Sequence, residues 1–281
     1  MSAPPILTDR TALALHRARA RRIGPESLLH DLTADEIEER LKEVNRRFTD
    51  PAVVTGWPDF WAARMPQARI VADDPVLDLH EGAHDLVIHA LSMHWADDPV
   101  GQLVQCRRAL RPDGLLLAAL PAGRSLQELR AVLAETEARL TGGLSPRVVP
   151  MAEIRDLGAL LQRAGFALPV ADADLRVLEY RDLFHLIGDL RASGETSALA
   201  ARNRRPPPRA FWPEAAAVYG AHYAAAEGRI RATVEIVVLT GWAPAPGQPE
   251  PLRPGSARQS LAQALGTRET RLRDTDADGG L

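Results

Sequence analysis

A segment in the middle of the chain shows the clearest alternation between apolar and polar stretches. Residues 85–91, DLVIHAL, form a short apolar run with β-branched side chains, which is typical of a buried parallel strand. Asp97 and Asp98 then precede Pro99, the order expected where a helix begins, and apolar residues at helical spacing follow. Residues 115–120, LLLAAL, are again entirely apolar. The pattern therefore predicts a strand, a crossover helix and a parallel strand, which together are a βαβ unit.

Similar periodicities predict further elements on both sides of this unit. Helices are expected within residues 9–22, around 35–48, near 126–140 and over 151–164. Strands are expected at residues 52–56, 68–72, 175–180 and 233–240. We expect the last two strands to pair as a hairpin at the far edge of the sheet, with a connection that is expanded by helices.

These elements predict a doubly wound α/β fold with helical additions. The expected boundaries are an N-terminal helical segment at 1–48, the α/β domain at 49–243 with a helical insertion at 181–226, and a tail at 244–281. The tail is rich in Pro, Gly, Ser and charged residues and has no sustained periodicity, so we expect it to be loosely held.

Composition and charge narrow the class of protein. Of the 281 residues 46% are hydrophobic, so a sizeable core can form, and the formal net charge of -3 gives no reason to expect a nucleic-acid partner. The single cysteine, Cys106, excludes a disulfide framework and a cysteine-only metal cage, and we expect it to pack in the core. No apolar run reaches transmembrane length and the N-terminus lacks a signal-peptide core, so we expect a cytoplasmic protein. Peripheral association with a membrane stays open.

A basic cluster lies near the N-terminus. Residues 17–22, RARARR, fall within a predicted helix and are balanced by an acidic helix beyond it. We favour a solvated helix face as the interpretation, with a docking surface for an acidic partner as the alternative.

Candidate chemistry gathers just past the strand at 85–91. Ser92, His94 and Trp95 follow that strand at the end where open α/β sheets bind ligands. They either line a pocket or pack the loop under the next helix. A metal site of two histidines and a carboxylate could be built from His89 or His94 with Asp73 or Asp74, but the spacing does not require it. We therefore predict no metal site and assign no catalytic residue.

Several motifs, in order along the chain, resemble one known family. They are SMHWADDP at 92–99, GGLSP at 142–146, DLGALLQRAGF at 156–166, RIRAT at 229–233 and TGW at 240–242. The chain resembles the complex I assembly factor 5 family, which is related to the malonyl carrier-protein methyltransferase of the biotin pathway. The resemblance implies a class I, Rossmann-like methyltransferase fold with S-adenosylmethionine (SAM) as its cofactor. It also implies a role in maturing respiratory complex I, by hydroxylating an arginine on the quinone-site subunit, which would be a protein client.

The cofactor motif departs from that family. A SAM site of this type needs a glycine-rich turn after the first strand and an acidic residue after the second to hold the ribose. Here only Gly56 remains of the glycine pattern, bulky residues follow it, and the first βα units are shortened. The strand at 68–72 with Asp73 and Asp74 aligns better with the family's third strand, so the ribose carboxylate is expected to be out of place. We predict that SAM binding is weak or lost.

The candidate cofactor-binding positions are Gly56, Asp73, Asp74, Ser92, His94 and Trp95. Two hypotheses follow from the resemblance and the broken motif. In the first, the protein is an enzyme that modifies a side chain of its client. In the second, the cofactor half has decayed and the fold chaperones its client. A third is an active SAM-dependent methyltransferase that acts on a small molecule or a carrier protein.

Overall fold

The computed structural model describes residues 6–24, 28–248 and 266. Within these residues a six-stranded sheet has the strand order β2-β1-β3-β4-β6-β5. The strands are β1 (Pro51–Thr55), β2 (Arg69–Ala72), β3 (His84–Ala90), β4 (Leu110–Pro121), β5 (Ala167–Tyr180) and β6 (Ile230–Trp242). The strands β2, β1, β3 and β4 run parallel, whereas β6 pairs antiparallel with both β4 and β5.

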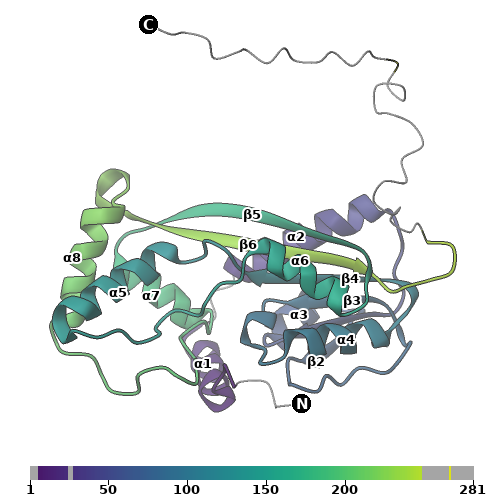
Figure 1. The fold of residues 1–281 in the computed structure, drawn as a ribbon, viewed down its shortest axis with the longest axis horizontal. Coiled ribbons are helices and arrows are strands. Elements are labelled where there is room, and N and C mark those ends of the chain that lie inside the picture. Colours follow the sequence, from purple (N-terminus) through teal and green to yellow (C-terminus); the bar gives the residue numbers. More distant parts are fainter. Residues whose placement is uncertain (1–5, 25–27, 249–265, 267–281) are drawn as a thin grey trace, which may run out of the picture. The chain divides into compact units, whose positions relative to one another are not determined.

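Helices cover both faces of the parallel strands (Figure 1). On one face, α4 (Pro99–Ala109) and α6 (Ile154–Arg163) share a buried core with strand residues such as Val54. On the other face, α2 (Leu28–Val44) and α3 (Pro58–Arg64) share a core with strand residues such as Val53. Because successive strand side chains point to opposite faces, a strand covered on both sides must be apolar throughout. This explains the continuous apolar runs, and the predicted doubly wound α/β class is confirmed.

The hairpin of β5 and β6 extends past the rest of the sheet. β6 pairs with β4 only from Ile236 onward, but it pairs with β5 from Ile230. The projecting half packs against α5 (Gln127–Thr141), α7 (Leu183–Ala192) and α8 (Phe211–Tyr223). The predicted hairpin with helices in its connection is thus confirmed. Both strands are longer than predicted. The first half of β5 contains Pro169, Asp172 and Asp174, residues that are rare in strands but tolerated at the edge of a sheet.

The N-terminal helix α1 (Arg10–Ile23) lies between the helices at the projecting hairpin and the carboxyl edge of the parallel strands (Figure 1). The Asp9 carboxylate caps it by accepting a hydrogen bond from the Ala12 N–H at 3.0 Å. Leu13 is buried with Trp95 of the loop after β3 and with Leu199 of the insertion. Helix α1 therefore connects two parts of the chain that are distant in sequence.

The second helix begins earlier than predicted. Because α2 spans Leu28–Val44 rather than residues around 35–48, its acidic residues Asp35, Glu36, Glu38 and Glu39 lie in its middle, and Phe48 lies beyond its end. These carboxylates make tertiary contacts instead: Glu38 accepts a hydrogen bond from Arg64 Nε of α3 at 2.6 Å. Asp98 caps α4 as predicted, whereas Asp97 accepts hydrogen bonds from the Leu7 and Thr8 N–H groups.

Three further expectations concern the core and the tail. Cys106 is buried, and burial raises the pKa of its thiol to about 12, as expected for a core side chain. The tail predicted at 244–281 lies almost wholly outside the described residues. Among the helices of the described part, none is long and apolar enough to cross a membrane.

We predict that His30 makes stability depend on pH. This buried side chain of α2 packs against Trp57 and Phe60, and burial lowers its pKa from 6.5 to about 4. The unfolded chain therefore binds a proton between these two pH values that the folded chain does not bind. Stability should fall as the pH drops through this window, by about 1.4 kcal/mol per pH unit and about 3 kcal/mol in all.

Urea unfolding of the wild type and of His30→Phe, measured from pH 7 to pH 4.5, checks this prediction. The difference in unfolding free energy between the two proteins should shift steadily against the wild type as the pH falls. A difference that stays constant with pH would show that His30 is not the group responsible.

Candidate functional site

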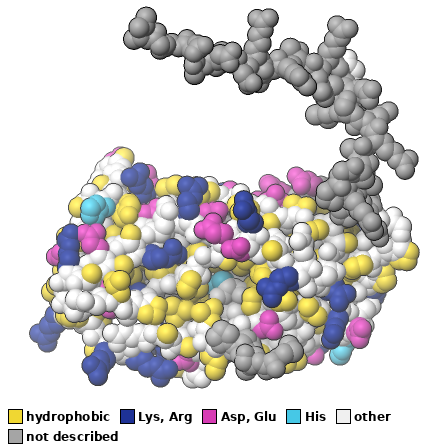
Figure 2. Space-filling model, viewed as in Figure 1, with side chains coloured by type: hydrophobic (Ala, Val, Ile, Leu, Met, Phe, Trp, Pro, Cys, Tyr) yellow, Lys and Arg dark blue, Asp and Glu magenta, His cyan; other side chains and the backbone are white. Residues whose placement is uncertain are grey.

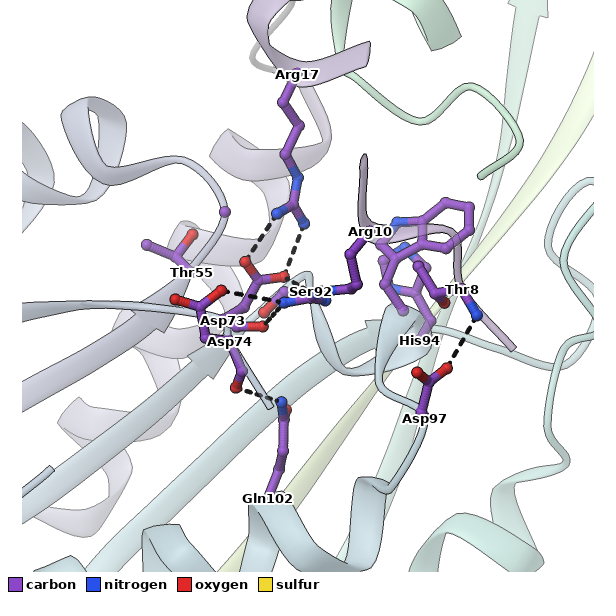
Figure 3. A network of polar contacts seen from close by, with 12 residues as sticks. Thr8, Arg10, Arg17, Thr55, Asp73, Asp74, Ser92, His94, Asp97 and Gln102 are labelled. Atoms are coloured by element: carbon purple, nitrogen blue, oxygen red, sulfur yellow. Dashed lines mark hydrogen bonds and ion pairs between the residues drawn. The ribbon is translucent and has the colours of Figure 1, made fainter. Parts of the chain in front are cut away.

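Three loops at the carboxyl edge of the parallel strands hold the residues predicted to bind a cofactor (Figure 3). These loops follow β1, β2 and β3, and they carry Gly56, Asp73, Asp74, Ser92, His94 and Trp95. Neighbouring parallel strands end along the same edge of a sheet, which is why residues far apart in sequence meet here. The structure thus brings the predicted positions together, and their function stays a proposal.

A buried ion pair occupies the centre of this edge. Arg17 of α1 donates from Nη1 to Asp73 Oδ1 at 2.8 Å and from Nη2 to Asp73 Oδ2 at 2.9 Å. The side chains of Arg17 and Asp73 are only 9% and 7% exposed. Burial by itself would raise the pKa of the Asp73 carboxyl, but the hydrogen bonds and charge of Arg17 outweigh it and lower that pKa. Figure 3 shows Arg17 pointing from α1 directly into the edge of the sheet.

A second arginine of α1 reinforces this contact. Arg10 donates to the backbone carbonyl of Asp73, and its guanidinium lies 3.6 Å from Asp74 Oδ1. Arg10, Arg17 and Arg21 are spaced by seven and four residues, so they share one face of the helix. The sequence had suggested that the basic cluster is a solvated helix face or, alternatively, a docking surface for an acidic partner. The burial of Arg17 shows that the face is not fully solvated. The inner face of the cluster binds the protein's own acidic loop.

The turn after β1 is covered by the same helix. A side-chain carbon added at Gly56 would lie 2.1 Å from Arg17 Cζ, so only glycine leaves room for the guanidinium here. Arg21 also donates to the Gly56 carbonyl at 3.0 Å. The one remaining glycine of the motif thus allows the close approach of an arginine side chain.

The bulky residues after Gly56 do not fill this space, contrary to expectation. Trp57 and Trp61 are buried in the core between the sheet and the helices α2 and α3. The residue that takes the room is Arg17, about forty positions earlier in the chain. Sequence reasoning missed this because it searched the glycine loop itself for the obstacle.

The position of Asp73 also corrects an expectation. β2 pairs directly with β1, so Asp73 follows the strand next to β1. In doubly wound folds this is the place of the acidic residue that holds a cofactor ribose. A carboxylate is therefore present in the customary place, although the alignment of motifs had moved it elsewhere.

Two groups that a SAM site would use at this edge are in contact with Arg17. The carboxylate that would accept the ribose hydroxyls accepts both of its hydrogen bonds from Arg17. The glycine turn that would approach the cofactor backbone is in contact with the same guanidinium. Binding SAM here would require α1 to move, which would separate the buried charges of Arg17 and Asp73.

The loop after β3 contains a separate hydrogen-bonded chain. Gln102 Nε2 donates to the Asp74 carbonyl at 3.1 Å, which leaves Gln102 Oε1 to accept from His89 Nε2 at 2.8 Å. Ser92 Oγ lies 3.4 Å from His89 Nδ1. Burial lowers the pKa of His89, so the ring is neutral with its proton on Nε2. Within the described ranges, no three His, Cys, Asp or Glu residues are grouped so as to hold a metal ion.

His94 and Trp95 contact a carboxylate that the sequence did not reveal. His94 Nε2 lies 2.9 Å from Glu195 Oε2, and Trp95 Nε1 donates to the same oxygen at 3.1 Å. Glu195 follows α7 in the helical insertion, one hundred residues after Trp95. The glycine before it, Gly194, has a positive φ and leaves only 2.9 Å between an added Cβ and Trp57. The Gly194-Glu195 pair is visible in the sequence, but it lies about one hundred residues from His94 and no sequence pattern indicates that the two meet.

Glu195 and His94 line a cavity of about 390 Å³ next to the cofactor edge. Helix α7 and the segment after it, residues 193–203, supply the largest part of the lining, together with α5, residues 146–149 and the start of α2. Helices α1 and α8 contribute His16 and Trp212. On the face in Figure 2, hydrophobic side chains gather over the region between α7 and α1, among scattered charges of both signs. The cavity is therefore a second candidate binding site, distinct from the edge that Arg17 covers.

The comparison with known families agrees with this fold. Residues 27–118 match the model of a family described as "Methyltransferase domain". The chain therefore carries a methyltransferase-like domain, the class in which SAM is the usual cofactor.

Individual proteins are also similar to this chain. The arginine-hydroxylase NDUFAF5, mitochondrial, of Danio rerio is 36% identical over 199 residues, which are 70% of this chain and 61% of that protein. A malonyl-[acyl-carrier protein] O-methyltransferase of Laribacter hongkongensis is 35% identical over 183 residues, covering 65% of this chain and 59% of its own. The solved YcgJ protein of Bacillus subtilis has a TM-score of 0.45 at 10% identity, over 71% of this chain and 94% of its own.

These relatives confirm the resemblance to the complex I assembly factor 5 family that the motifs indicated. The chain is similar to the NDUFAF5 proteins and matches a methyltransferase domain over residues 27–118. It spans about three fifths of the length of the zebrafish relative.

We predict that the ion pair between Arg17 and Asp73 is needed for stability as a pair. Asp73→Asn should lower the unfolding free energy by about 3–5 kcal/mol, because it leaves the Arg17 charge buried without a partner. The double variant Arg17→Met with Asp73→Leu should recover most of this loss, since an apolar pair of similar volume carries no uncompensated charge. Urea unfolding of each variant measures the difference.

Asp74→Asn is the matched control. The Asp74 side chain is 71% exposed, and its contact with Arg10 at 3.6 Å should contribute little. If Asp73→Asn proved as stable as Asp74→Asn, the buried pair would not stabilise α1 on the sheet.

Proposed function

We propose that this protein supports the maturation of respiratory complex I by acting on a quinone-site subunit as its protein client, without using SAM as a methyl donor. The observation that supports this most directly is the Arg17 guanidinium on Asp73 and Gly56, where a cofactor would otherwise bind. The similarity to NDUFAF5 proteins supports the choice of pathway.

Two modes of action are compatible with this proposal. In the first, the client is modified, as the name arginine-hydroxylase states for the relative. In the second, the client is held while it assembles. In either mode, the cavity beside His94 and Glu195 is the site at which the chain would receive a client segment. A cytoplasmic location and peripheral association with a membrane stay predictions.

A second candidate function is methyl transfer to a carrier protein or a small molecule. The similarity to the malonyl-[acyl-carrier protein] O-methyltransferase favours it. It would require Arg17 to move, since its guanidinium contacts both oxygens of Asp73 and the turn at Gly56. The two functions therefore differ in whether SAM binds to the purified protein.

We predict that SAM binds at least two decades more weakly than to an intact site. Each of the two lost contacts, the ribose carboxylate and the glycine turn, should cost roughly 1–3 kcal/mol, which together corresponds to about two to four decades in affinity. Isothermal titration of the full chain with SAM measures this. A micromolar dissociation constant for the wild type would contradict the proposal and favour methyl transfer.

We predict that deleting the gene in the native host lowers NADH-driven quinone reduction in membranes and leaves other dehydrogenases unchanged. Mass spectrometry of the quinone-site subunit then separates the two modes. An arginine that carries an extra oxygen in the wild type and loses it in the deletion strain supports modification, and His94→Ala should reproduce that loss. Failed assembly with an unchanged arginine supports holding. Normal complex I activity in the deletion strain would overturn the proposal.

A further inference from the structure

Glu195 is a buried carboxylate with one oxygen left for a ligand. Its Oε2 atom receives the contacts of both His94 Nε2 and Trp95 Nε1, and no described residue donates a hydrogen bond to Oε1. The Glu195 side chain is 17% exposed and the His94 side chain 6% exposed. The Nδ1 atom of His94 is buried without a hydrogen-bond partner among the described residues. Two polar groups at this point thus have unused hydrogen-bonding capacity.

The carboxylate remains ionised in this position. Burial by itself would raise the pKa of Glu195, but the charge of His94, its hydrogen bond, the charge of Arg17 and the Trp95 N–H together lower it. A negative charge is therefore held inside a cavity wall, where an incoming cation would interact with it more strongly than at the surface.

The rest of the cavity suits a long side chain with an apolar stem. Its walls include leucines of α5 and α7 and a tryptophan of α8, namely Leu129, Leu133, Leu186, Leu190 and Trp212. Such walls would pack against methylene groups and exclude water from the carboxylate.

Two of the arginines that line the cavity are already paired. Arg147 donates to Glu137 Oε1 at 2.8 Å and lies over the Phe211 ring at 4.4 Å. Arg202 donates to Asp9 Oδ2 at 2.9 Å. These pairs neutralise two of the three arginines of the lining, the third being Arg191 of α7. The two paired arginines therefore do not compensate the charge of Glu195.

We propose that Glu195, oriented by His94 and Trp95, binds the guanidinium of an arginine side chain that a protein client inserts into this cavity. The planar guanidinium matches a carboxylate and can stack on aromatic rings such as Trp212, and its stem matches the leucine walls. Glu195 is thereby the residue that determines specificity at this site. The inference rests on the proposed function for the nature of the client, but it concerns the binding step alone.

Isothermal titration of the full chain with two short peptides tests the proposal. One peptide is acetyl-Gly-Arg-Gly-amide, and the other carries citrulline, a neutral isostere, in place of arginine. We expect saturable binding of the arginine peptide and at least tenfold weaker binding of the citrulline peptide, because charge-assisted hydrogen bonds contribute roughly a factor of ten to one hundred. Equal affinities, or no binding of the arginine peptide, would overturn the proposal.

Two variants assign the effect to Glu195. Glu195→Gln should weaken the arginine peptide at least tenfold and remove the preference over citrulline, whereas Glu214→Gln, at an exposed carboxylate outside the cavity lining, should change neither. If Glu195→Gln does not fold, Leu190→Trp is the variant that tests the proposal. It fills the cavity without removing the carboxylate, so it should also weaken binding of the arginine peptide. Unchanged peptide binding in a folded Glu195→Gln variant would overturn the assignment. If that variant does not fold, unchanged peptide binding in Leu190→Trp would overturn it.

The outcome is independent of the deletion experiment. Preferential binding of the arginine peptide with normal complex I activity in the deletion strain would keep the site and reject the proposed pathway. Impaired complex I with no preference for arginine would do the reverse.

Discussion

The arrangement of this molecule depends on the buried ion pair between Arg17 and Asp73. A charged guanidinium taken out of water must be matched by an anion with good geometry, and the two parallel hydrogen bonds to Asp73 supply that match. The pair fixes α1 across the carboxyl edge of the sheet. Because α1 also packs against the insertion through Leu13, the same contact positions His16 of α1 in the cavity lining.

This ion pair changes what a methyltransferase-like edge can do. An acidic residue and a glycine are both present at this edge, as Asp73 and Gly56, and both contact the Arg17 side chain. The loss of neighbouring glycines is then not simply decay. One glycine is retained because the guanidinium needs the space that its missing Cβ leaves. Under the proposed function, the cavity that His94 and Glu195 line is the site that would receive the client.

The cavity itself depends on the long hairpin. Because β5 and β6 run past β4, helices α5, α7 and α8 can pack at a distance from the parallel strands and still face them across α1. The buried Glu128 of α5 accepts a hydrogen bond from the Thr233 N–H of β6 and holds this group of helices in place. Glu195 reaches His94 only because the insertion folds back from the projecting end.

The sequence by itself determined the α/β class, the βαβ unit, the hairpin with its helical connection and the group of loops that meet at the sheet edge. These follow from periodicity within short windows, since burial on two faces dictates apolar runs and parallel strands end at a shared edge. Only the tertiary structure decided that Arg17 occupies that edge, that Asp73 stands next to β1, and that Glu195 joins His94. The two side-chain contacts join residues 56 and 101 positions apart, and no local pattern of hydrophobic and polar residues specifies which distant side chains meet.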